Sequence, residues 1–427
     1  MPGIFGLLGT SFYVLGDTLI VGQALGRAGL ASLNLSIPMI NFMQGIGLLL
    51  GFGGSTALSR ALGRGAKKRA KEWAEKTITW SIILGFLLLF LLRLFFKPLL
   101  LLLTGGGPAL AGAEAYLGIL FYFSPAYVIF QSLVVLLRND GAAKLAMLSL
   151  LLCSGLNVAL DALFLFVFDW GMYGAGLATG LAQLAGLILA LTHLRKADLL
   201  KDLSPRPRPP FRLMAKGMAS FVMELSQGVV IFTFNTVLLS LQGELAVSSY
   251  AIIANLSLIF TAIFLGLAQG AQPLLARAHG AGNKEEFMEI LRFGQELSFL
   301  LSALVLGLCL LAPRLLSSIF ISGDPELLDM TVGGLRIYAL GFVFLAYNLI
   351  GTIALQSSAK SREAFSFALV RGMLLLILYL LLLQKFFGLY GVWFAFFLTE
   401  LTGFIWLQRI LRRDFAELKS PRFRRCG

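Results

Sequence analysis

Charged residues are scarce in this chain: they make up 13% of its 427 residues, whereas soluble domains carry roughly 25%. The chain also has only two His and three Cys. Cys153, Cys309 and Cys426 have no paired spacing, so they predict neither a disulfide framework nor a metal site. No Ser/His/Asp or Cys/His arrangement is visible, which argues against catalysis. An intramembrane enzyme stays an alternative, and turnover of a lipid without transport would identify it.

Apolar residues are abundant, at 58% of the chain, and the mean hydropathy is +0.85. A helix that crosses a bilayer needs about 20 mostly apolar residues. The sequence predicts twelve such spans, at about 3–24, 31–57, 77–96, 112–136, 145–167, 172–193, 217–240, 247–275, 293–312, 331–355, 364–384 and 388–408. Each span must satisfy its own backbone hydrogen bonds in lipid, so we expect helices. The predicted fold class is an all-α membrane protein with twelve transmembrane helices.

The net charge of +13 could indicate nucleic acid, but its placement indicates a bilayer. Most basic residues fall in alternate short connections and in the tail after residue 408. This is the distribution that the positive-inside rule gives to cytoplasmic loops. We therefore expect no nucleic-acid partner and a multi-pass protein of the cell (inner) membrane with both termini in the cytoplasm. The first apolar segment, which bears Asp17, is expected to remain in the mature protein.

The two halves of the sequence resemble each other when they are shifted by 217 residues. The matching positions include Gly53 and Gly270, Arg60 and Arg277, Gly63 and Gly280, Tyr173 and Tyr390, and Gly186 and Gly403. Each half holds six predicted spans, so the halves form parallel repeats, a transporter architecture with the substrate site expected between them. The predicted organisation is an amino-terminal lobe (1–195), a cytoplasmic linker (196–216), a carboxyl-terminal lobe (217–410) and a basic tail (411–427). The Pro- and Arg-rich run 204–210 predicts an extended linker.

Acidic residues inside predicted spans are the strongest indicators of function, because a charge at the bilayer centre costs about 3 kcal/mol on insertion scales. Asn157 and Asp161 are four residues apart and share one helix face. Their oxygens suit a hard cation or a proton, and Thr179 in the next span could add a hydroxyl group. The alternative is a polar clamp between helices, worth on the order of 1 kcal/mol.

Asp17 lies deep in the first span with no basic residue near it in sequence. It is a candidate proton carrier, and the alternative is a hydrogen bond to a neighbouring helix. Glu224 and Gln227, one turn apart, could contact a cationic substrate or a second cation, or act structurally. Glu400, in the last span, is expected to pair structurally with Arg371.

Several motifs, in order and at similar spacing, resemble the multidrug and toxic compound extrusion (MATE) family across nearly the whole chain. They are Asp17-Thr18-Leu19-Ile20-Val21-Gly22, Gly53-Gly54-Ser55-Thr56-Ala57, Asn157-x-x-x-Asp161 and the run 171–179. The resemblance implies a buried acidic site for Na⁺ or H⁺ at Asp17, Asn157, Asp161 and Thr179. It also places Glu224 at an acidic position of some members. The predicted tenth span, 331–355, holds no acid, in contrast to some members.

By this resemblance we expect a monomeric antiporter that exports small amphipathic or cationic organic compounds in exchange for Na⁺ or H⁺, with no other cofactor. One alternative is a flippase for lipid-linked sugars of the wider superfamily, which would be expected to line its cavity with basic residues. Another is a major-facilitator transporter, whose halves are parallel repeats as well. The loop after the second span fits the MATE pattern better.

Overall fold

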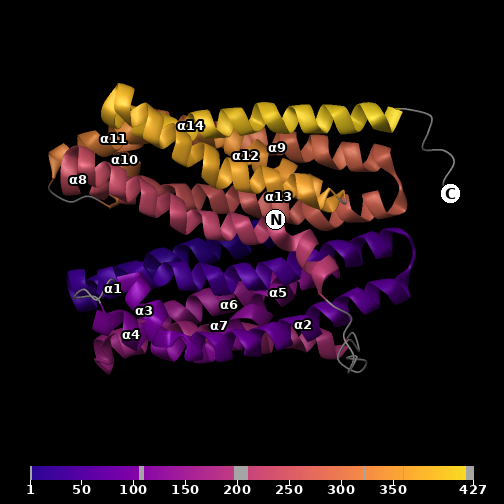
Figure 1. Cartoon of the computed structure of the whole chain (residues 1–427), viewed down its shortest axis with the longest axis horizontal. Helices are drawn as coiled ribbons and strands as arrows, with labels where there is room; N and C mark the ends of the chain where they lie inside the picture. The colour runs from indigo at the N-terminus through magenta and orange to yellow at the C-terminus, as the bar shows by residue number, and fades with distance from the viewer. Residues whose placement is uncertain (1, 105–109, 197–209, 321–323, 359, 420–427) are drawn as a thin grey trace. The chain divides into compact units, whose positions relative to one another are not determined.

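The computed structural model describes residues 2–104, 110–196, 210–320, 324–358 and 360–419, which form helices almost throughout and no β-strand (Figure 1). Two compact units divide the chain, Met1–Gly228 and Val229–Gly427. The first unit contains α1 (Pro2–Gly63), α2 (Lys67–Leu94), α3 (Phe96–Thr104), α4 (Leu110–Leu120), η1 (Phe121–Phe123), α5 (Ser124–Asn139), α6 (Ala143–Ala162), the π-helical η2 (Leu163–Val167), α7 (Gly171–Lys196) and the start of α8 (Phe211–Ala281). The second unit contains the rest of α8, α9 (Lys284–Leu311), α10 (Pro313–Ser318), α11 (Pro325–Ala339), α12 (Gly341–Ser357), α13 (Ser361–Leu369), the π-helical η3 (Val370–Leu375) and α14 (Leu376–Lys419).

The helices of the described residues account for the twelve predicted spans. Ten are long and apolar enough to cross a membrane, and α11 with α12, bent by 44°, adds an eleventh. One of the ten, Ser361–Arg413, has 53 residues, about 80 Å of helix against a hydrocarbon core of about 30 Å. It is broken at Gly388, where φ is 55° and ψ is −133°, so it supplies two spans. The predicted fold class is confirmed.

Glycines in the left-handed backbone region confirm the internal repeat. Glycine adopts positive φ without the steric penalty that a Cβ brings. Three pairs of such glycines recur at the 217-residue shift, with φ values of 62° and 66° at Gly26 and Gly243, 70° and 73° at Gly65 and Gly282, and 52° and 55° at Gly171 and Gly388. The same backbone break or turn thus occurs at equivalent places of both repeats.

The start of α8 packs closely against α1 within the first unit. A Cβ added to Gly53 of α1 would lie 2.0 Å from the carbonyl oxygen of Leu213, and one added to Gly217 would lie 1.9 Å from that of Leu49. These two glycines let the helix backbones touch. Residues 211–228 therefore belong to the first compact unit, whereas the sequence assigned 217–228 to the carboxyl-terminal lobe.

The predicted limits of lobes, linker and tail stay predictions. Most of the linker, including the extended run except Pro210, lies outside the described residues, as does the tail beyond Lys419. Up to Lys419 the tail continues the helix of α14.

Candidate cation site

A row of glycines brings the first part of α1 against α6. Gly9 and Gly16 lie seven residues apart, on one helix face. A Cβ at Gly9 would lie 2.5 Å from the side chain of Leu151, and one at Gly16 would lie 3.1 Å from that of Val158. The missing side chains allow the close approach that sets Asp17, the next residue, beside α6.

Asp17 of α1 and Asp161 of α6 meet inside the first unit. Their exposed fractions are 8% and 0%, and the two carboxyl groups lie within electrostatic and hydrogen-bonding reach of each other. Oδ1 of Asp17 and both oxygens of Asp161 have no hydrogen-bond donor among the described residues. Two ionised carboxylates can only accept hydrogen bonds, so a proton or a cation is needed to join them. The structure thus brings together the two acids that the sequence selected separately.

Asn157 and Thr179 complete the predicted set, and both are buried. Asn157 Nδ2 donates to Thr179 Oγ1 at 3.3 Å, and that hydroxyl donates to the carbonyl oxygen of Ala175 at 3.0 Å. These bonds turn the amide so that Asn157 Oδ1 stays without a donor. It is a fourth buried oxygen available to a cation, beside the three carboxylate oxygens.

Tyrosines that the sequence interpretation missed surround this site. The hydroxyl of Tyr116, on α4, lies 3.3 Å from Thr179 Oγ1, and the ring position places it in the field of both Asp17 and Asp161. Tyr13 lies one turn before Asp17 on the same face of α1. That four-residue spacing, the same as between Asn157 and Asp161, was the available signal for Tyr13. Nothing in the sequence pointed to Tyr116, because its contact with Thr179 joins two helices far apart in the chain.

Glu224 also belongs to the first unit and is half-buried. Gln44 of α1 donates its side-chain Nε2 to Glu224 Oε1 at 2.8 Å. The sequence interpretation missed Gln44 as a partner. The side chain of Gln227 is exposed. Its predicted role beside Glu224 stays a prediction.

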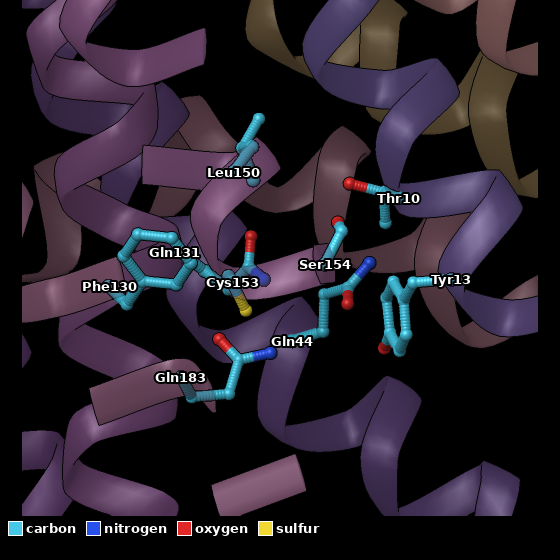
Figure 2. A pocket seen from close by; sticks show the side chains of 9 residues that line it. All are labelled: Thr10, Tyr13, Gln44, Phe130, Gln131, Leu150, Cys153, Ser154 and Gln183. Carbon is cyan, nitrogen blue, oxygen red and sulfur yellow. The ribbon is translucent and has the colours of Figure 1, made fainter. Parts of the chain in front are cut away.

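A small polar pocket lies between these two acidic places. Figure 2 shows its lining side chains gathered around Cys153. They are Thr10, Tyr13, Gln44, Phe130, Gln131, Leu150, Cys153, Ser154 and Gln183. Tyr13 connects the pocket to Asp17, and Gln44 connects it to Glu224.

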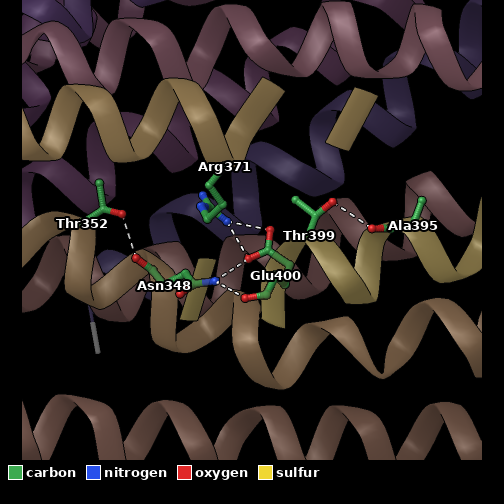
Figure 3. Close-up of polar contacts among 6 residues, drawn as sticks. All are labelled: Asn348, Thr352, Arg371, Ala395, Thr399 and Glu400. Atoms are coloured by element: carbon green, nitrogen blue, oxygen red, sulfur yellow. Dashed lines mark hydrogen bonds and ion pairs between the residues drawn. The ribbon is translucent and has the colours of Figure 1, made fainter. Parts of the chain in front are cut away.

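Glu400, a buried acid of the second unit, has different surroundings (Figure 3). Arg371 Nη1 donates to both oxygens of Glu400, at 2.6 and 2.7 Å, and Asn348 Nδ2 donates to Oε2 at 2.7 Å. Arg371 and Glu400 are 5% and 4% exposed. The predicted pairing of Glu400 with Arg371 is confirmed.

Two parallel six-span repeats, with acids held inside them, define the class of membrane transporters built from such repeats. The sequence matches the MatE family over residues 2–163 and 219–399. The chain therefore belongs to this family, as its motifs had indicated, and the major-facilitator alternative is wrong.

Known relatives extend over almost the whole chain. The multidrug export protein MepA of Staphylococcus saprophyticus is 26% identical over 405 residues, which cover 94% of this chain and 89% of MepA. MepA of Staphylococcus aureus is 23% identical over 414 residues with the same coverage. A solved structure described as the outward-facing conformation of a multidrug resistance MATE family transporter has a TM-score of 0.91. It is 23% identical, with 98% of this chain and 95% of that chain covered. This likeness shows the shared fold.

Proposed function

We propose that the protein is a secondary antiporter of the cell membrane that exports amphipathic organic cations or drugs in exchange for H⁺ or Na⁺. Its membership of the MatE family and its multidrug-export relatives support the export of organic compounds. The single observation that carries the coupling is the contact of Asp17 with Asp161, three of whose four carboxyl oxygens lack donors among the described residues. Two buried negative charges without compensation are costly, so binding of a cation there releases free energy that can change the conformation.

The residues present fit either coupling ion. A proton on one carboxyl group would form the missing hydrogen bond to the other. A sodium ion would find oxygen ligands on Asp17, Asp161 and Asn157, which are the hard donors that such cations prefer. The hydroxyl of Thr179 stands beside them as a further ligand.

The rest of the cycle follows from linkage. A cation and a substrate are coupled when their binding free energies differ between two conformations. Entry of the cation from outside would favour the conformation that releases the drug, and loss of the cation to the cytoplasm would restore the conformation that binds it.

The flippase alternative would need free basic groups in the bundle to hold a pyrophosphate. Arg371, a buried base of the second unit, is bound by Glu400 instead. The described acids Asp17, Asp161 and Glu224 favour cationic substrates. One solved neighbour, a MOP superfamily transporter from Pyrococcus furiosus, is described by a reverse polarity of its binding pocket that suggests a different function.

Purified protein in liposomes tests the proposal. We expect a fluorescent organic cation to move against an imposed pH or Na⁺ gradient, with each gradient applied alone to identify the coupling ion. Asp17→Asn and Asp161→Asn should each reduce transport to the background of empty liposomes. Asp329→Asn is the matched control, since that carboxylate is exposed and pairs with the exposed Arg314. Unchanged transport in both buried-site variants would refute the assignment.

A further inference from the structure

The polar pocket of the first unit has an exact positional counterpart in the second unit. The 217-residue shift relates Gln131 to Asn348, Ser154 to Arg371 and Gln183 to Glu400. In the first unit these three positions line the pocket and are neutral. In the second unit the same three positions hold an amide, a guanidinium group and a carboxylate that bind one another. The repeat has thus placed a charged cluster where its other copy has a pocket.

The cluster is electrically neutral and its carboxylate is fully bonded, although Arg371 Nε and Asn348 Oδ1 have no hydrogen-bond partner among the described residues. Asn348 Nδ2 donates to both Glu400 Oε2 and the carbonyl oxygen of Glu400, at 2.7 and 2.9 Å. The guanidinium group of Arg371 lies 5.7 Å from the ring centre of Phe367, so an aromatic face covers it. Asn348 itself is fully buried. Neither oxygen of the Glu400 carboxylate is without a donor, in contrast to Asp161.

Close packing fixes the guanidinium group in place. A Cβ at Gly403 of α14 would lie 2.9 Å from Arg371 Cδ and 3.1 Å from Asn348 Nδ2. The arginine side chain therefore runs across a bare glycine. Arg371 lies in the π-helical turn η3, and such turns are frequent at functional sites.

We propose that Arg371 is a tethered cation, which permanently occupies a cation site formed by Glu400 and Asn348 in the second unit. A mobile H⁺ or Na⁺ has no place there while the guanidinium group is bound. If the proposed antiport is correct, ion exchange takes place in the first unit, which holds Asp17, Asp161 and Glu224. The assignment of the tethered cation itself does not depend on transport.

The proposal predicts that removing the tether creates an ion site. Arg371→Gln leaves Glu400 buried without its cation, and the carboxylate then needs a proton or Na⁺ from solution. Tyr338 of α11 is also within electrostatic reach of Glu400, and its phenol supplies no positive charge. The new site should therefore take one cation per chain.

The test uses the full-length protein with Asp17→Asn and Asp161→Asn as background, so that these two acids contribute nothing, and the uptake of the background, including that of Glu224, is subtracted from every variant. Cation binding is measured in detergent as the shift of the apparent melting temperature with Na⁺, against choline, and as proton uptake between two buffered pH values. We expect no uptake at Glu400 in the background. Adding Arg371→Gln should give uptake of one cation per chain, and adding Arg371→Lys, which retains a cation, should give none.

Arg371→Gln with Glu400→Gln is the matched control, because it removes both charges and should abolish the new uptake. If Arg371→Gln alone folds only in acid or in Na⁺ while this double variant folds without them, the tether is supported. Uptake by Glu400 in the background protein, or no cation response on removing Arg371, would overturn it. Since every readout is binding or folding, a failed antiport assay would leave this result interpretable.

Discussion

The two units treat a buried carboxylate in opposite ways. In the first, Asp17 and Asp161 face each other, and three of their oxygens lack a donor within the described part of the chain. In the second, Glu400 receives an arginine and an amide. A compensated charge is stable in one conformation, whereas an uncompensated pair must take up an ion from outside the protein. On the proposed function, one copy of the repeat therefore supplies a fixed ion pair and the other an ion-responsive site.

The largest loss of stability is expected in the second unit, where Arg371 compensates the charge of Glu400. Glu400→Ala would leave the guanidinium group of Arg371 buried and unpaired, at a cost of about 3–5 kcal/mol in the free energy of unfolding. Replacing both residues by apolar ones, as Arg371→Met with Glu400→Leu, should be nearly neutral, because no charge is then stranded. Thermal unfolding monitored by fluorescence would measure both. If Glu400→Ala melts like the parent, the pair does not stabilise the second unit.

A pair of equivalent glycines separates packing from electrostatics. Gly53→Ala would place its Cβ 2.0 Å from the backbone oxygen of Leu213, and backbone cannot move aside as a side-chain end can. Overpacking of this kind costs about 1–3 kcal/mol.

The repeat supplies the control for this substitution. Gly270, the counterpart of Gly53, has nothing within 4 Å of an added Cβ. Gly270→Ala should therefore leave the melting temperature unchanged or slightly raised, since alanine loses less backbone entropy on folding than glycine. Equal losses at both positions would show that the crossing of α1 and α8 is not a close backbone contact.

A smaller effect is expected at Thr179. Thr179→Val keeps the side-chain shape but removes the hydroxyl that receives Asn157 and contacts Tyr116. One buried hydrogen bond is worth about 1 kcal/mol, so cation affinity should fall by about 5- to 10-fold. Titration of transport rate against the coupling ion would show this shift. Unaltered ion dependence would exclude Thr179 from the site.

The smallest change in stability is expected from Asp17→Asn. The neutral amide can donate to Asp161 and removes one uncompensated charge, so the protein should be as stable as the parent, or about 1 kcal/mol more stable. The same thermal-unfolding assay would test this. A clear loss of stability would mean that the Asp17 carboxylate has a structural partner, in contrast to the comparison drawn above.

Local spacing made part of this site predictable. The four-residue spacing of Asn157 and Asp161, and the acid at position 17 in an apolar span, identified half of the site directly. Arg371 and Glu400 were predicted to pair because each needs an opposite charge in the bilayer. A charged residue inside a membrane span is costly unless it has a partner, so few pairings of such residues are plausible.

Contacts between helices that are far apart in the chain could not be predicted from the sequence. The contact of Asp17 with Asp161 depends on the close approach of α1 and α6. Gly9 and Gly16 permit this approach, but their positions in the sequence do not predict which helix packs against them. Tyr116 and Gln44 were missed for the same reason, because each is a single polar residue on another helix. The helix breaks, by contrast, follow the apolar pattern of the sequence: Gly26, Gln242 and Gly243 lie between predicted spans, and Gly388 is the first residue of the last one.

The number of cations bound by the purified protein tests the central claim most directly. Binding of H⁺ or Na⁺ would be compared in the native chain, in Asp161→Asn, and in the neutral double variant Arg371→Gln with Glu400→Gln. The account predicts that Asp161→Asn loses the bound cation while the double variant keeps it. Loss of the cation in the double variant, with full binding in Asp161→Asn, would contradict the account.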